Sequence, residues 1–239
     1  LRDVTATVDN MSLIASSIMS KKLAAGADAI VLDVKTGSGA FMKSREDAFA
    51  LAEEMVKIGK NAGRKTIAVI SDMDQPLGRA VGNALEVKEA IATLRGEGPE
   101  DFRELCMVLG SQMLLAGGKA ESVEQAREML NRVIADGSAL RKLAQFVEAQ
   151  GGDPVAVTDP GLLPKASMVV PVCTDRAGYV GRIACEDIGI CSLLLGGGRE
   201  TKESQIDLSV GILLEKKTGD AVKKGDVLGY LHANDEQRL

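Results

Sequence analysis

The chain has 239 residues, of which 45% are apolar and 26% charged, and its formal net charge is −5. This length and composition indicate a globular protein with one large domain or two smaller ones. Nucleic-acid binding is disfavoured because there is no dense tract of lysine and arginine. No apolar run is long enough to span a bilayer, and no signal peptide is visible. We therefore expect a cytoplasmic protein that contacts neither membrane nor nucleic acid.

Four cysteines and one histidine are spread along the chain without metal-site spacing. Cys106, Cys173, Cys185 and Cys191 form no C-x-x-C pair, and His232 is the only histidine. A zinc site would need such ligands grouped together. Dispersed, buried thiols in a reducing compartment are the expected arrangement.

The first predicted helix spans residues 12–25, with Ser12 as its N-cap. Ser17 and Lys21 are four positions apart, so they share one face of this helix. Together with Arg2 they form a set of donors without a base or a thiol. Such donors suit a carbonyl-bearing ligand that gains negative charge during a reaction. Judged by residue types alone, a solvent-exposed charged helix face is the simpler interpretation.

A strand–helix–strand unit follows. Residues 29–34 predict a buried strand, residues 44–62 an amphipathic helix and residues 65–71 a second strand, which together form a parallel βαβ unit. The glycine-rich loop at residues 35–39 follows the first strand directly, where ligands bind in open α/β sheets. It is not a Walker A loop, because its lysine precedes its glycines. A tight turn between strand and helix explains these glycines equally well.

The rest of the chain divides into a helical stretch and a strand-rich stretch. Helices are predicted at residues 84–94, 99–116, 122–136 and 138–150, the third with a Ser122 and Gln125 capping box. Strands are predicted at residues 169–172, 178–183 and 210–214, a helix at 186–195, and a turn and hairpin at 218–228. The composition changes near residues 163–164. The fold class is therefore α/β, with a second, smaller α+β domain from about residue 166.

Several long segments resemble one enzyme family, the pyrimidine nucleoside and thymidine phosphorylases. These segments are Leu1-Arg2-Asp3-Val4-Thr5-Ala6-Thr7-Val8-Asp9 with Ser17 and Lys21, Asp33-Val34-Lys35-Thr36-Gly37-Ser38-Gly39-Ala40-Phe41-Met42, Gln75-Pro76-Leu77 through Gly82-Asn83 to Glu86-Val87, and Leu195-Gly196-Gly197-Gly198-Arg199 with Lys202 and Ile206-Asp207. The resemblance covers essentially the whole chain, and the third segment is closer to the bacterial enzymes that accept both uridine and thymidine.

The resemblance implies phosphorolysis of pyrimidine nucleosides (uridine, thymidine, deoxyuridine) to the free base and a pentose 1-phosphate, with phosphate as co-substrate. Arg2, Ser17 and Lys21 would bind the pyrimidine base, and Phe41 would lie beside it as an apolar wall. Electron density accumulates on the base as the glycosidic bond breaks. Donors at the base oxygens would therefore bind the transition state more tightly than the ground state.

The resemblance also implies a structural potassium ion. The carbonyls of Leu77 and Ala80 and the carboxylate of Glu89 would be its ligands, an all-oxygen set that suits a hard cation. From the residues alone, Glu89 is an ordinary glutamate on a helix surface.

The family's organisation suggests how this chain is divided. Residues 1–26 would be a remnant of its helical base-binding domain, residues 27–165 its α/β domain, and residues 166–239 the carboxyl-terminal α+β domain, which has a hairpin like that of biotinyl and lipoyl domains. The family's phosphate-binding segment and catalytic histidine would precede residue 1, so no catalytic residue is expected in this chain, and alone it would be inactive. The intact enzyme would be a homodimer, and His232 would be structural.

Two alternatives remain from the sequence. The first is a non-catalytic carrier module, suggested by the hairpin at residues 219–226. It lacks the acceptor lysine that a carrier would need in the following turn. The second is an enzyme like anthranilate phosphoribosyltransferase, which would need a pyrophosphate-binding loop and magnesium carboxylates. Arg2, Ser17, Lys21 and the carboxyl-terminal domain argue against it.

Overall fold

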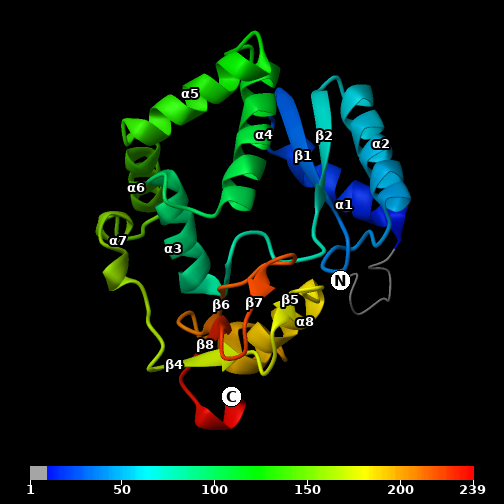
Figure 1. Cartoon of the computed structure of the whole chain (residues 1–239). Coiled ribbons are helices and arrows are strands. Elements are labelled where there is room, and N and C mark those ends of the chain that lie inside the picture. Colours follow the sequence, from blue (N-terminus) through cyan, green and yellow to red (C-terminus); the bar gives the residue numbers. More distant parts are fainter. Residues whose placement is uncertain (1–9) are drawn as a thin grey trace. The chain divides into compact units, whose positions relative to one another are not determined.

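The computed structural model describes residues 10–239, so Arg2 lies outside the described residues (Figure 1). Packing divides the chain into two compact units. The first unit extends to Met73 and includes Glu104–Asn131, and the second comprises Asp74–Arg103 and Arg132–Leu239.

The first unit is built around two parallel strands. Strand β1 (Ala29–Thr36) pairs in parallel with β2 (Lys65–Asp72), in a register that places Ala29 opposite Lys65. Helix α2 (Arg45–Asn61) joins these strands and packs on both. Helix α1 (Met11–Ala24) precedes β1 and packs against α2. The predicted parallel βαβ unit is therefore confirmed.

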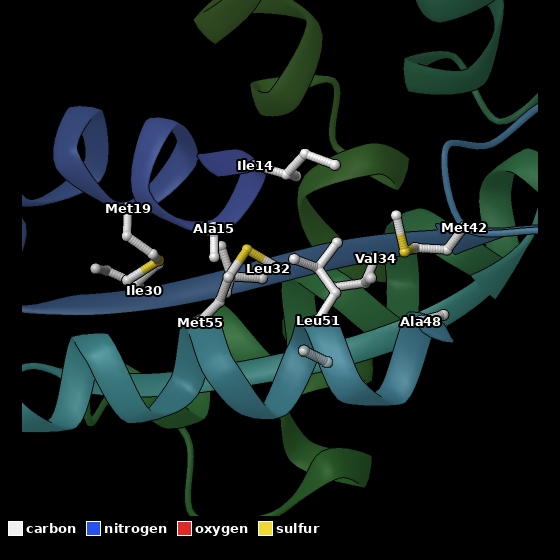
Figure 2. Close-up of a cluster of buried hydrophobic side chains, with 11 residues drawn as sticks. Ile14, Ala15, Met19, Ile30, Leu32, Val34, Met42, Ala48, Leu51 and Met55 are labelled. Carbon is white, nitrogen blue, oxygen red and sulfur yellow. The ribbon is translucent and has the colours of Figure 1, made fainter. Parts of the chain in front are cut away.

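The apolar core of the first unit lies between α1, β1 and α2. Figure 2 shows side chains from the two helices converging on those of β1. The buried members of this core are Ile14, Ala15, Met19, Ile30, Leu32, Val34, Met42, Ala48, Leu51, Ala52 and Met55. Their spacing follows the helical repeat in α1 and α2 and the two-residue alternation in β1, as expected for elements that each bury one face.

Helices α1 and α2 both have polar N-caps, but one is not the residue predicted. The side chain of Ser44 accepts a hydrogen bond from the backbone N–H of Asp47 at the start of α2. At the start of α1, the side chain of Asn10 accepts from the N–H of Leu13 at 3.0 Å. The prediction of Ser12 as N-cap was therefore wrong. Asn and Ser are equally good caps, so sequence preference could not choose between them.

Helices α3 to α6 follow closely the predicted helical stretch. Their bounds are α3 (Asn83–Leu94), α4 (Glu100–Ala116), α5 (Val123–Ala135) and α6 (Ser138–Ala149), followed by two short helical turns, α7 (Val155–Thr158) and η2 (Pro160–Leu162). The Ser122 side chain accepts from the Gln125 N–H at 3.2 Å, as predicted. The Gln125 side chain, however, accepts from the N–H of Glu121 rather than from that of Ser122.

The second unit contains a four-stranded antiparallel sheet with the order β3-β6-β8-β4. Its strands are β3 (Ala80–Val81), β6 (Gly211–Leu214), β8 (Val227–Ala233) and β4 (Met168–Cys173), and a separate pair is formed by β5 (Gly178–Tyr179) and β7 (Ala221–Val222). The buried core on this sheet includes Leu195, Val210, Ile212, Leu214 and Ala233. Strand β3 belongs to this sheet although it precedes residue 166. The boundaries at residues 26 and 165 stay a prediction.

Some predictions for the carboxyl-terminal part were wrong in detail. The strand expected at residues 178–183 ends at Tyr179. The helix expected at residues 186–195 is α8 (Cys185–Ser192), followed by a wider turn, η3 (Leu193–Gly197). Glycine at position 196 has a φ of 104°, which a helix cannot continue through. The chain ends in a short turn, η4 (Glu236–Arg238).

The cysteines are less buried than predicted. Cys185 is buried, whereas Cys106, Cys173 and Cys191 are exposed, and none of these four described cysteines forms a disulfide bond. Cys173 lies on β4, most of whose residues are exposed. Helix and strand periodicity do not by themselves say which face is covered. In the part of the chain from residue 10 onward, no helix is long and apolar enough to cross a membrane.

Candidate functional site

Ser17 and Lys21 lie one turn apart on α1, beside the buried face formed by Ile14, Ala15 and Met19. Ser17 is half-buried and Lys21 is exposed. Among the described residues, no hydrogen bond or ion pair engages the Lys21 ammonium group. Ser17 and Lys21 therefore lie on the same side of the helix, with about 6 Å of axial rise between their Cα atoms.

The glycine-rich loop after β1 folds back across the carboxyl ends of both strands. The N–H of Gly37 donates to the carbonyl of Met42 at 3.1 Å, and the N–H of Gly39 donates to the carbonyl of Met73, just after β2, at 2.9 Å. Gly37 has a φ of 119°, which a residue with a side chain rarely adopts. The loop holds Phe41 with 66% of its surface exposed. An aromatic face is thus available to a ligand at this edge of the first unit.

A polar triad that the sequence did not suggest links β1 and β2. Lys35 Nζ donates to Asp33 Oδ2 at 2.7 Å and to Ser71 Oγ at 3.0 Å, while Ser71 Oγ donates to Asp33 Oδ1 at 2.5 Å. Strand alternation places this triad on the face opposite Leu32 and Val34, which are buried. The two charges satisfy each other, so the triad acts as a cross-strand tie. Only the register of β1 on β2 brings Ser71 to it.

In the second unit, the Glu89 carboxylate on α3 binds the loop that precedes β3. Glu89 Oε1 accepts hydrogen bonds from the backbone N–H of Arg79 at 2.9 Å and of Ala80 at 3.1 Å. The other carboxylate oxygen, Oε2, lies beside Gly78, where an added Cβ would come within 2.2 Å of it. Gly78 has a φ of 68°. The loop is therefore shaped to approach this carboxylate closely.

Two further charged residues hold the same loop. Lys217 Nζ donates to the carbonyl of Pro76 and, at 2.6 Å, to that of Gly78, and it pairs with Asp101 Oδ2 at 3.1 Å. Asp101 Oδ2 in turn accepts from the N–H of Gly78 at 3.2 Å. Only 15% of the Lys217 side chain is exposed. The loop is thus held by hydrogen bonds with Glu89 on α3, Asp101 on α4 and Lys217 in the segment after β6.

The carbonyls of Ala80 and Leu77 have directions set by these bonds. Ala80 pairs with Leu213 in the antiparallel ladder, and its N–H points to Glu89 rather than to β6. The N–H and C=O of one strand residue point to the same side, so the Ala80 carbonyl also faces the side of Glu89. In a trans peptide the C=O points opposite to the following N–H. The Leu77 carbonyl is therefore directed away from Asp101, which binds the Gly78 N–H.

Burial raises the pKa of Glu89 above its ordinary value, and the N–H groups of Arg79 and Ala80 partly offset that rise. The neighbouring Asp101 carboxylate raises the pKa further, whereas the Lys217 ammonium lowers it. For Asp101, hydrogen bonds and the charge of Lys217 outweigh burial, so its pKa is lowered. The charge of Lys217 thus lowers the pKa of both carboxyl groups, although only Asp101 is in direct contact with it.

The structure brings together Ala80 and Glu89 of the predicted cation ligands, with Leu77 three residues before Ala80 in the same loop. Asp101 and Lys217, which hold this loop, were missed. Lys217 lies next to Lys216 in a charged run, and no pattern in the sequence distinguishes the two. His232 lies in β8, between β4 and β6. Within residues 10–239, no group of three or more His, Cys, Asp or Glu side chains is arranged to bind a metal ion.

Comparison with known proteins gives two profile matches. Residues 1–140 match the glycosyl transferase family, a/b domain. Residues 179–239 match the pyrimidine nucleoside phosphorylase C-terminal domain. The second match favours a phosphorylase over the anthranilate phosphoribosyltransferase alternative, because that alternative did not account for the carboxyl-terminal domain.

Individual relatives agree with these profiles. The chain is 61% identical over 237 residues to a pyrimidine-nucleoside phosphorylase of Geobacillus stearothermophilus. This match covers 99% of this chain and 55% of the relative. It is 59% identical over 236 residues to the enzyme of the same name from Bacillus subtilis, covering 99% of this chain and 54% of that protein. The resemblance seen in the sequence is confirmed. The chain spans about half the length of the curated relatives it matches.

Proposed function

Since this chain belongs to the glycosyl transferase family through its a/b domain, we propose that it acts in the phosphorolysis of pyrimidine nucleosides. The observation that supports this is the 61% identity to a pyrimidine-nucleoside phosphorylase along almost the whole chain. The reaction transfers a pentose from a pyrimidine base to phosphate and yields the free base and a pentose 1-phosphate. The enzyme would work in the cytoplasm as a homodimer.

We propose that Arg2, Ser17 and Lys21 bind the pyrimidine base, with Phe41 beside it. Ser17 and Lys21 support this role because they share one side of α1 and the ammonium group has no other partner among the described residues. As the glycosidic bond breaks, negative charge grows on the base oxygens. An ammonium point charge and neutral donors stabilise that charge more than they stabilise the bound nucleoside.

The test is phosphate-dependent release of uracil and thymine by the longest natural protein that carries this sequence. Replacing Lys21 by methionine is expected to lower kcat/KM by about 100-fold or more, by analogy with the loss of one oxyanion donor. Lys22→Met is the matched control, because Lys22 is also exposed and adjacent on the same helix. Its activity is expected to stay within about twofold of the wild type. Near-normal turnover by Lys21→Met would contradict the assignment.

We also propose that a potassium ion binds the carbonyls of Leu77 and Ala80 and the carboxylate of Glu89. The donor set is made of oxygen atoms, as a hard monovalent cation prefers. The Ala80 carbonyl faces the side of Glu89, and the raised pKa of that half-buried carboxyl indicates a charge that a cation would stabilise. When bound, the ion would supply positive charge that orders this loop, while the residues themselves hold its backbone.

Stability in the presence of different monovalent salts tests the cation site. The thermal midpoint of the protein is measured in KCl and in choline chloride at equal ionic strength. Saturable stabilisation by KCl is expected, because a ligand that binds only the folded state raises its stability. Glu89→Gln should weaken that response. An identical midpoint in both salts would refute the site.

A further inference from the structure

The loop before β3 contains a positive charge that is part of the protein itself. The ammonium group of Lys217 has three N–H donors, and three oxygen atoms surround it: the carbonyls of Pro76 and Gly78 and the Asp101 carboxylate. No donor is left over for solvent. The segment that carries Lys217 is further tied to this loop by a bond from the Thr218 N–H to the Gln75 side chain at 3.0 Å.

These contacts determine where the Leu77 carbonyl points. Lys217 holds the carbonyls on either side of Leu77, those of Pro76 and Gly78. It also holds Asp101 Oδ2, which accepts from the Gly78 N–H. The peptide that joins Leu77 to Gly78 is planar, so binding its N–H on one side directs its C=O to the other. The peptides flanking it are bound through their carbonyls, so this orientation cannot relax by rotation of neighbouring residues alone.

We propose that Lys217 is a positioning residue, whose ammonium group acts as a tethered cation that holds the Leu77 carbonyl in place for a bound monovalent cation. The inference rests on the proposed potassium site. The tethered charge is already ordered by folding, so the loop needs little further ordering when the free ion binds.

A neutral lysine analogue tests the role directly. Lys217→Met keeps an unbranched side chain that lacks only the terminal group, and it removes the charge and the donors. The concentration of KCl that gives half of the maximal thermal stabilisation is expected to rise at least tenfold in this variant. Lys224→Met is the control, because Lys224 is an exposed lysine in the turn between β7 and β8. Its half-maximal KCl concentration should equal that of the wild type. The measurements use the longest natural protein that carries this sequence.

A second variant covers the case in which Lys217→Met does not fold. Asp101→Asn keeps an oxygen for the Gly78 N–H but loses the ion pair with Lys217, so a smaller rise in the half-maximal KCl concentration is expected. If either folded variant responds to KCl at the wild-type concentration, Lys217 does not position the cation ligands and the inference is wrong, although the cation site stands. If the wild type itself shows no response to KCl, the proposed cation site fails and the inference fails with it.

Discussion

At the scale of single residues, Gly78 shows how a backbone conformation can serve a neighbouring carboxylate. Its φ of 68° disfavours any residue with a Cβ, and that Cβ would lie 2.2 Å from Glu89 Oε2. Gly151 has a similar φ of 82° but no atom within 4 Å of an added Cβ. Both glycines belong to the second unit. Alanine substitutions at these two glycines therefore separate the free energy lost through the left-handed conformation from the free energy lost by moving Glu89.

We expect Gly78→Ala to lower the free energy of unfolding by clearly more than Gly151→Ala does. The left-handed conformation alone should cost about 1–2 kcal/mol in both variants. In Gly78→Ala the Glu89 carboxylate must also move and release the N–H groups of Arg79 and Ala80. Urea denaturation of both variants measures the difference. Equal losses would show that Glu89 can move without cost.

At the scale of elements, α2 is a case in which hydrophobic periodicity is enough to predict which face of a helix points inward. The helical repeat predicts an inward face of six residues, of which four are buried and two are half-buried. The buried ones are Ala48, Leu51, Ala52 and Met55, and the half-buried ones are Val56 and Ile58. The helix packs on both β1 and β2, so its inward face is the same whichever way the rest of the chain is arranged. The cap of α1 is a different case, because two suitable residues, Asn10 and Ser12, compete and the path of the backbone decides between them.

Met55→Ala should lower the free energy of unfolding by about 2–5 kcal/mol, the usual range for a fully buried methionine. Met55 is 2% exposed and contributes to the core shown in Figure 2. Glu54→Ala is the matched control on the exposed face of the same helix, and its effect should stay within about 0.5 kcal/mol. Chemical denaturation followed by circular dichroism measures both. A loss below about 1 kcal/mol for Met55→Ala would mean that this core tolerates a cavity by collapsing.

At the scale of the whole molecule, the single histidine makes stability depend on pH. Burial, and then the charge of Lys88, lower the pKa of His232 below its ordinary value of 6.5. The unfolded chain therefore binds this proton more tightly than the folded chain does. The contribution to stability is complete above pH 6.5 and is lost as the pH falls from there through the lower pKa of the folded state.

We expect the free energy of unfolding to fall as the pH drops below 6.5, and this part of the fall to be absent in His232→Gln. Because His232 is the only histidine, its imidazole proton resonance can be followed by NMR without ambiguity. A titration midpoint below 6.5 is expected in the folded protein. A midpoint at or above 6.5, or an unchanged pH profile in His232→Gln, would rule out this source of pH dependence.

What the sequence by itself determined is the family, the order of the longer helices and of β1 and β2, and most of the buried faces of these elements, whereas β3 was predicted as part of a loop. Long motifs identified the family. The hydrophobic repeats of 3.6 and two residues predicted α2 and β1, because each of these elements buries one face locally. Ser17 and Lys21 could be paired from their spacing for the same reason.

Only the tertiary structure decided which distant residues meet. Ser71 reaches Asp33 and Lys35 through the strand register, and Lys217 reaches the loop before β3 from 139 residues away. Such contacts depend on how the elements pack, and the type of a side chain does not reveal that packing. Lys216 and Lys217, for example, are identical residues in adjacent positions. The physical reason is that a charged side chain holds the backbone around it only where folding removes it from water and surrounds it with oxygen atoms. That environment exists only in the folded chain.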